Sequence, residues 1–182
     1  KNIYEICYFG TIYGPRLQNK LADGIKLYCK KLVTLNVQFK FIGSFSFEFK
    51  NAFKNLQNVQ FVQDVSHTKA IEMMQNADVL IMILTNDIEG KIGFTGKFFE
   101  YLRTKRPILA LVPNGEVSKI IYNNNIGEIA LPDSAESIAE AIEKIINRLH
   151  NGSLLMPSEN NYFMMFDRYL LTVQLVDILT KM

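Results

Sequence analysis

The chain has 182 residues, of which 48% are hydrophobic and 21% are charged, and its formal net charge is +2. These values are typical of an ordinary soluble globular protein and exclude a largely disordered chain. The net charge is too small, and the basic residues are too scattered, to indicate a nucleic-acid partner. The two cysteines lack metal or redox spacing, and no apolar run reaches the roughly 20 residues that span a bilayer. We therefore expect a cytoplasmic protein; because the chain starts without methionine, we also expect a fragment of a longer one.

Strand and helix patterns alternate along most of the chain. Apolar runs predict six strands, at residues 3–9, 37–42, 59–62, 79–84, 108–112 and 126–131. Helical spacing of apolar residues predicts helices near residues 17–32, 67–76, 97–105, 116–122 and 138–149. Between two of the strands, alternating Phe45, Phe47 and Phe49 indicate an extended piece that packs on the core. The alternation predicts a doubly wound α/β domain with a parallel sheet over residues 1–150.

Residues 151–157 interrupt this alternation, and a last helix is predicted from about residue 158 to 181. This helix has more apolar residues than one narrow buried stripe can use: Phe163, Phe166, Leu170, Leu171, Val173, Leu175, Ile178 and Leu179. The helix is therefore expected to pack against a second surface. Dimerisation through this face and contact with a membrane surface are two of the alternatives.

The loop at residues 85–96 follows the fourth strand. Parallel sheets bind ligands at the carboxyl ends of their strands, so this loop is the first candidate site. Thr95 is expected to cap the following helix, and Gly96 lets another molecule approach its backbone. The free amides and the positive end of the helix dipole attract phosphate. Glu100, one turn later, is placed either to bind a ribose or to be a solvated helix carboxylate.

Two further features suggest anion binding. A glycine-bearing turn at residues 10–14 follows the first strand, and such turns either bind phosphate or simply reverse the chain. The densest basic cluster lies on or after the helix at 97–105, where it either holds a diphosphate or an anionic lipid, or forms a solvated face: Lys97, Arg103, Lys105 and Arg106. Both interpretations remain open from the sequence.

Residues 96–121, GKFFEYLRTKRPILALVPNGEVSKII, resemble the donor-binding half of retaining glycosyltransferases of the GT-B fold, family four (glycosyl transferases group 1). In that family a phosphate-binding turn leads into a helix with a glutamate and then a Gly/Arg-Pro-Ile/Val strand. The resemblance implies a Rossmann-like half of a GT-B fold with no metal and no cofactor. It also implies that Glu100 binds the nucleotide ribose and that the backbone at Thr95 and Gly96 meets the diphosphate of the donor. Lys97, from the basic cluster, is a further candidate donor-binding residue.

The same resemblance implies roles for residues near the other strand ends. Gly10 and Thr11 lie against the donor phosphates, and Val65 contacts the base. Arg16 and Lys20, four residues apart and so on one helix face, neutralise the leaving diphosphate.

The chain departs from the family pattern at one position. Many members carry two glutamates with seven residues between them, but the residue eight before Glu100 is Ile92. Glu89, followed by Gly90, is the candidate replacement from a loop three residues longer.

The resemblance implies a hexosyltransferase that moves a sugar from a UDP- or GDP-type donor to an acceptor, in capsular or surface polysaccharide synthesis. Residues 151–182 would then pack on a missing N-terminal acceptor-binding domain. A membrane surface or a lipid-linked acceptor would be a further partner, and the cytoplasmic protein would then lie at the inner face of the membrane. We expect this chain alone to bind nucleotide but to transfer little or no sugar.

The sequence leaves alternative functions open. A sugar-nucleotide epimerase would use a similar half domain, and a degenerate non-catalytic nucleotide-binding module is favoured by Ile92. A dinucleotide-dependent dehydrogenase is disfavoured, because the first turn, GTIYGPR, lacks the G-x-G-x-x-G spacing.

Overall fold

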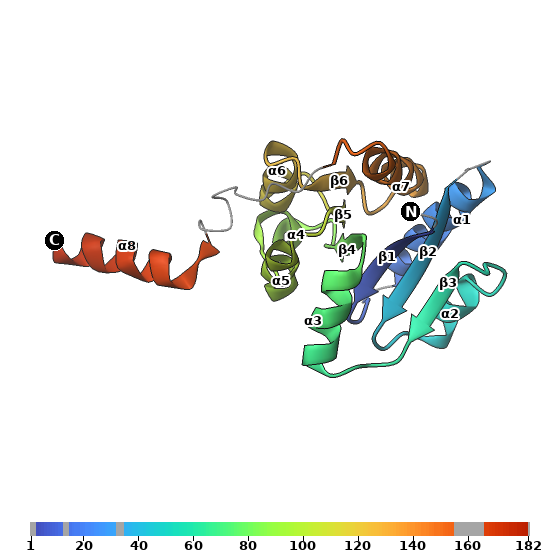
Figure 1. The fold of residues 1–182 in the computed structure, drawn as a ribbon, viewed down its shortest axis with the longest axis horizontal. Coiled ribbons are helices and arrows are strands. Elements are labelled where there is room, and N and C mark those ends of the chain that lie inside the picture. Colours follow the sequence, from blue (N-terminus) through green and yellow to red (C-terminus); the bar gives the residue numbers. More distant parts are fainter. Residues whose placement is uncertain (1–2, 13–14, 32–34, 155–165, 182) are drawn as a thin grey trace.

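The computed structural model describes residues 3–12, 15–31, 35–154 and 166–181, with residues 15–18 described by their backbone alone. In this part of the chain, a six-stranded sheet has the order β3-β2-β1-β4-β5-β6 (Figure 1). Each pair of neighbouring strands is parallel. The strands are β1 (Ile3–Phe9), β2 (Asn36–Ile42), β3 (Val59–Val62), β4 (Val79–Ile83), β5 (Ile108–Leu111) and β6 (Gly127–Ala130). The predicted doubly wound α/β fold is confirmed.

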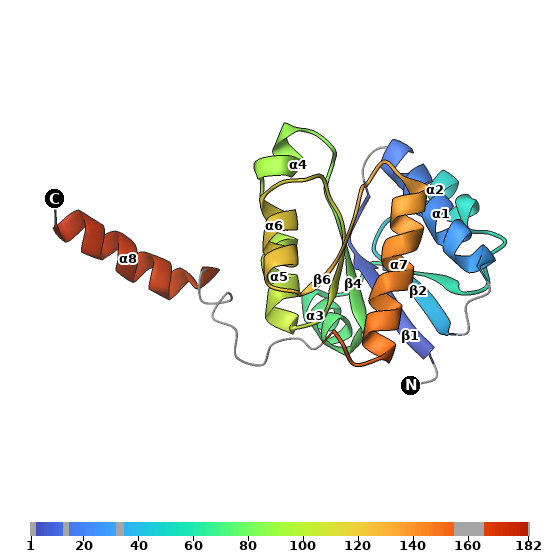
Figure 2. The same ribbon diagram turned by 90° about the horizontal axis from the view of Figure 1, so that it is seen from above.

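Helices cover both faces of the sheet. Those of the described residues are α1 (Pro15–Lys30), α2 (Phe47–Ala52), α3 (His67–Asn76), α4 (Ile88–Ile92), α5 (Gly96–Thr104), α6 (Glu116–Asn123), α7 (Ala135–His150) and α8 (Arg168–Thr180). Figure 2 shows α1, α2 and α7 on one side of the strands and α3, α5 and α6 on the other. This two-sided cover explains why the strands read as unbroken apolar runs.

The strand β4 shows how one apolar run serves two cores. Val79 and Ile81 belong to the core beneath α1, α2 and α7, whereas Leu80 and Met82 belong to the core beneath α3, α5 and α6. All four side chains are buried. Successive side chains of a strand point to opposite faces, so a central strand needs apolar residues at every position.

The close packing of α1 on α7 depends on a glycine. A Cβ at Gly24 would lie 2.6 Å from Cγ2 of Ile138, which is tighter than any ordinary carbon contact. The helix α7 itself starts at Ser134, whose hydroxyl accepts a hydrogen bond from Ser137 N (3.1 Å). The buried stripe predicted for residues 138–149 is present, and the helix begins before it, at Ala135.

The phenylalanine-rich segment after β2 is helical, so the prediction of an extended piece was wrong. Ser46 caps α2 by accepting a hydrogen bond from Phe49 N (3.2 Å). Phe45, Phe49 and Phe53 lie before, in and directly after α2, four residues apart, and all three pack around Phe41. Phe47, which the alternation would place beside them, is exposed.

The last helix, α8, projects away from the sheet and its helices (Figure 1). None of its residues is buried, and its exposed apolar side chains are Leu171, Val173, Leu175, Val176, Ile178 and Leu179. Just before it, Phe166 packs on Phe94 and Phe99, with ring centroids 5.8 and 5.2 Å apart. The first residues of the predicted last helix lie outside the described residues. No helix in the described ranges is both long and apolar enough to cross a membrane.

Candidate functional site

The carboxyl ends of β1, β2 and β3 are tied together beside the point where the strand order reverses, which lies between β1 and β4. Gly10 N donates to Ile42 O (2.8 Å), and Gly43 N donates to Val62 O (3.0 Å). Gly10 and Gly43 have φ angles of 114° and 139°, a region that favours glycine. A Cβ at Gly43 would also collide with the Gly10 carbonyl. The two glycines therefore let the turns after β1 and β2 pack against each other.

The helix α5 begins at the same edge of the sheet. Thr95 occupies the predicted cap position. Its side chain makes no capping hydrogen bond, so the predicted capping interaction was wrong. Its backbone is extended and turns the chain into the helix. A Cβ at Gly96 would meet nothing within 4 Å, so the space in front of this first turn is open to another molecule. The first-turn amides of a helix lack intrahelical partners and attract anions.

Lys97 connects α5 to the end of β1. Its Nζ donates a hydrogen bond to Phe9 O and lies 5.2 Å from the centroid of the Tyr8 ring. A Cβ at Gly10 would collide with this Nζ. The Lys97 side chain is half-buried, so it does not belong to a solvated face, whereas Arg103 and Lys105 are exposed. The structure thus brings together the two segments that the sequence singled out separately.

The electrostatics of this contact are set by burial and by one carboxylate. Burial lowers the pKa of the Lys97 ammonium, and the charge of Glu100 acts in the opposite direction. Glu100 is half-buried and lies one helical turn after Lys97. Among the described residues it has no hydrogen-bond partner. Its carboxylate is therefore free to accept hydrogen bonds from a ligand.

The other predicted residues lie at the same edge of the sheet or face a different helix. Thr11 is exposed and its carbonyl accepts a hydrogen bond from the Tyr8 hydroxyl (3.0 Å). Val65, in the turn after β3, is half-buried against the core beneath α3 and α5. The side chain of Arg16 lies outside the described residues.

Lys20 is half-buried on α1 and is close to the first turn of α7. The pKa of Glu136 is lowered by hydrogen bonds from its own amide and from Ser134, and the Lys20 charge adds to this shift. Lys20 therefore lies close enough to the first turn of α7 for its charge to act on Glu136.

The loop after β4 contains a short helix that the sequence did not predict. Asp87 caps α4 by accepting a hydrogen bond from Gly90 N (2.8 Å), a bond that also lowers the pKa of this carboxyl. Glu89 was predicted on a loop, but it is an exposed residue of α4. Ile92 is 66% exposed on the same helix. The side chain of Asn86 also donates to Asp133 Oδ2 (3.0 Å), which ties this loop to the turn after β6.

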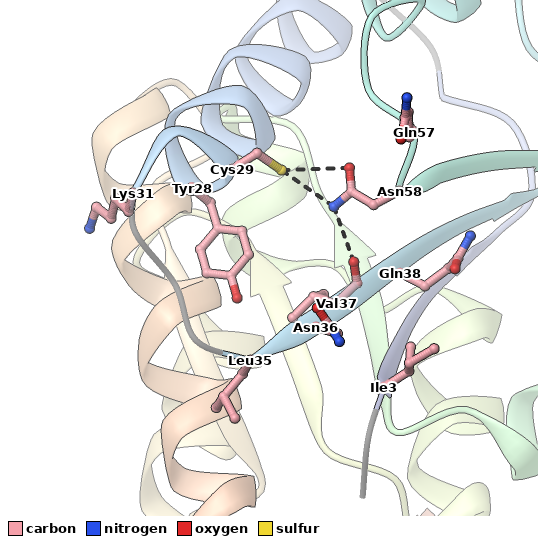
Figure 3. Close-up of a pocket in the computed structure, with 10 residues that line it drawn as sticks. All are labelled: Ile3, Tyr28, Cys29, Lys31, Leu35, Asn36, Val37, Gln38, Gln57 and Asn58. Carbon is pink, nitrogen blue, oxygen red and sulfur yellow. Dashed lines mark hydrogen bonds between the residues drawn. The ribbon is translucent and has the colours of Figure 1, made fainter.

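A separate pocket lies at the opposite, amino edge of the sheet (Figure 3). Its volume is about 420 Å³, and the residues that line it include Tyr28, Cys29, Asn36 and Asn58. The Asn58 amide nitrogen contacts Cys29 Sγ (3.4 Å) and donates to Val37 O (3.1 Å). These bonds join α1 to β2 and β3, so these polar groups serve the fold. None of the predicted site residues lines this pocket.

Within the described part of the chain, no group of three or more His, Cys, Asp or Glu residues is arranged to hold a metal ion. The groups present at the carboxyl edge include backbone amides, the Lys97 ammonium and the Glu100 carboxylate. That combination suits a phosphorylated ligand with hydroxyl groups.

Comparison with known proteins gives a consistent result. The family model described as "Glycosyl transferases group 1" matches residues 4–148 of this chain. No curated protein is a significant match.

Several solved structures share the fold. The chain is similar to the C-terminal domain of LpcC, a glycosyl transferase group 1 family protein from Francisella tularensis, with 18% identity and a TM-score of 0.65 over 91% of this chain and 86% of that one. It is similar to WaaG, a glycosyltransferase involved in lipopolysaccharide biosynthesis, with 18% identity and a TM-score of 0.62 over 98% of this chain and 47% of that one. The chain is also similar to the N-terminal domain of Candida albicans trehalose-6-phosphate phosphatase, with 13% identity and a TM-score of 0.59 over 80% of this chain and 34% of that one. At these identities the likeness shows a shared fold, and the chain spans about half of WaaG.

Proposed function

Because this chain belongs to the glycosyl transferases group 1 family, we propose that it is the nucleotide-sugar-binding half of a glycosyltransferase. One observation carries this proposal: Lys97 joins the Gly10 turn to the first turn of α5 at the point where the strand order reverses. Doubly wound sheets bind nucleotides at this point. The proposed donor is a nucleoside diphosphate sugar of the UDP or GDP type, used without a metal or another cofactor.

The donor is proposed to lie across the carboxyl edge of the sheet. Its diphosphate would contact the turn at Gly10 and Thr11 and the backbone at Thr95 and Gly96. The open space in front of Gly96 supports this placement. Glu100, without a hydrogen-bond partner among the described residues, would accept hydrogen bonds from the ribose.

The remaining contacts are proposed on the family resemblance alone. Val65 would contact the base. Glu89 would supply the carboxylate of the first family glutamate, whose position is occupied by Ile92. Arg16 and Lys20 would stabilise the leaving diphosphate by their charge. The contact of Lys20 with the start of α7 makes its role the least supported of these.

The second half of the enzyme would supply the acceptor site. The chain spans 47% of WaaG, and α8 exposes its apolar residues, which supports packing of residues 151–182 on an N-terminal domain. By analogy with WaaG, the acceptor would belong to surface polysaccharide synthesis at the inner face of a membrane, and the protein would be cytoplasmic. The isolated chain would then bind nucleotide and transfer little or no sugar.

One observation favours a second candidate, a nucleotide-binding module without catalytic activity. The position of the first family glutamate is occupied by Ile92, whose side chain is exposed on α4 and carries no charge. Sugar transfer by a full-length protein would exclude this candidate.

Thermal unfolding in the presence of UDP, GDP, ADP or NAD tests the proposed function. A ligand at a hundred times its dissociation constant adds about 2.7 kcal/mol, which raises the unfolding midpoint by several degrees. We expect one nucleoside diphosphate to raise the midpoint of the wild type and to have a weaker effect on Glu100→Gln. Glu140→Gln, which removes an exposed carboxylate on α7, is the matched control and should respond like the wild type. The absence of a shift with every nucleotide would contradict nucleotide binding by this chain.

A further inference from the structure

The Lys97 ammonium uses only part of its hydrogen-bonding capacity inside the described structure. An ammonium carries three N–H donors. One donates to Phe9 O, and the ring of Tyr8 lies 5.2 Å away. Among the described residues the ammonium has no second hydrogen-bond acceptor. Two donors therefore remain for a ligand or for water.

The position of this ammonium is fixed by three elements. Its side chain starts in the first turn of α5, passes the end of β1 and lies against Gly10. The lysine therefore reaches the turn after β1 from the side opposite to α1, the helix that carries Arg16 and Lys20. A cation held between a glycine turn and a helix N-terminus faces the two groups that bind phosphate best.

A second anion would stabilise the charge of this residue further. Lys97 is half-buried, and burial of a cation is unfavourable unless an opposite charge is near. Glu100 is the carboxylate on the same helix that acts on it, and the other contacts, Phe9 O and the Tyr8 ring, are neutral. A diphosphate beside Gly10 would supply the opposite charge directly.

We propose that Lys97 is a diphosphate ligand supplied by α5, and that its ammonium makes this site prefer a nucleoside diphosphate over the uncharged nucleoside. This inference rests on the proposed function and assigns one residue a specific task in it. The task differs from that of Glu100, which would recognise the ribose and therefore act on both ligands equally.

Binding of a nucleoside diphosphate and of its matching nucleoside to variants of this chain tests the proposal. The pairs are UDP with uridine, GDP with guanosine and ADP with adenosine, measured by chemical-shift titration. Lys97→Met removes the charge and keeps the length of the side chain. Lys97→Gln removes the charge but keeps a donor for Phe9 O, so it serves if the methionine variant does not fold. Lys97→Arg keeps the charge, and Lys91→Met removes an exposed lysine on α4 as the matched control.

We expect both neutral variants to bind the diphosphate at least about tenfold more weakly, with nucleoside affinity unchanged. The arginine variant should retain most of the diphosphate affinity, and Lys91→Met should bind like the wild type. Equal losses for nucleoside and diphosphate would make Lys97 a structural residue and overturn the proposal, as would unchanged affinity in both neutral variants. If the wild type binds neither ligand of any pair, the proposed function fails and this inference fails with it.

Discussion

The amino edge and the carboxyl edge of the sheet present different chemical groups to a ligand. The amino edge has the open pocket of about 420 Å³, where the Asn58 side chain hydrogen-bonds to Cys29 Sγ and to Val37 O of β2. The carboxyl edge has two positive-φ glycines, the start of α5 and a half-buried lysine. Phosphate binding needs amides and cations rather than a large hollow. The comparison teaches that the groups at the strand ends, rather than the size of a pocket, are the reason for proposing the carboxyl edge as the site.

Substitution at Gly43 should have the largest effect on stability and on nucleotide binding, because it disrupts the packing of the turns after β1 and β2. In Gly43→Ala the new Cβ would collide with the Gly10 carbonyl and would force alanine to a φ of 139°. We expect the free energy of unfolding to fall by about 3 kcal/mol, measured by urea denaturation, and nucleotide binding to be lost with the turn.

Gly96→Ala is the control for that experiment. Its Cβ meets nothing, so the free energy of unfolding should change by less than about 1 kcal/mol, while nucleoside diphosphate binding should weaken. Equal stability of Gly43→Ala and wild type would show that the two turns do not depend on close approach.

At the amino edge, Asn58→Ala should reduce stability without affecting the site. The substitution leaves Val37 O and the Cys29 thiol without the Asn58 side chain as partner. Loss of such a partner reduces the free energy of unfolding by about 2 kcal/mol. Nucleotide affinity of the folded protein should stay at the wild-type value in a titration. The neighbouring exposed Gln57 provides the control, since Gln57→Ala should alter neither quantity; a loss of affinity in Asn58→Ala alone would mean that the two edges are coupled.

The smallest effect at neutral pH is expected for Tyr28→Phe. The Tyr28 hydroxyl is buried and has no hydrogen-bond partner among the described residues, so its removal should leave stability unchanged or raise it by up to about 1 kcal/mol. A difference should appear at alkaline pH. Burial, and then the charges of Cys29 and Glu143, raises the pKa of Tyr28 from 10.0 to about 12.

The direction of that pH effect follows from proton binding. The unfolded chain loses the Tyr28 proton above pH 10.0, whereas the folded chain keeps it to about pH 12. Deprotonation therefore favours the unfolded chain: the free energy of unfolding is unaffected by Tyr28 below pH 10.0 and falls as the pH rises towards 12. At pH 11 the wild type should have lost about 1 kcal/mol more than Tyr28→Phe, as measured by urea denaturation at each pH. Parallel losses in the two proteins would contradict this assignment.

Most of the fold could be predicted because its signal is local. The apolar runs of the strands and the stripe of α7 are direct consequences of burial on both faces of the sheet. Two short helices were missed for different reasons. In α2 the alternation of Phe45, Phe47 and Phe49 concealed the four-residue spacing of Phe45, Phe49 and Phe53. In α4 five residues are too few for a helical period, and the signal was the cap at Asp87.

The candidate site was only partly predictable because its parts lie far apart in the sequence. Gly10 and Lys97 were both singled out, but nothing in the sequence shows that the lysine side chain reaches the end of β1. The participation of the Tyr8 ring was not predicted, because a tyrosine in a strand reads as a core residue. The pairing of Asn86 with Asp133 joins two loops that only the strand order brings together.

The strand order also has a consequence for how the chain folds during its synthesis. The strands β1, β2 and β3 and their phenylalanine cluster lie within residues 3–62, whereas β4 starts at Val79. The first half of the sheet can therefore assemble on the ribosome before the second half has been made. Until β4 arrives, the backbone of β1 at Ile6 and Cys7 has no neighbour on one side, because their partners are Val79 and Leu80. That unpaired edge is a template for association with other nascent chains, and the arrival of β4 ends the exposure.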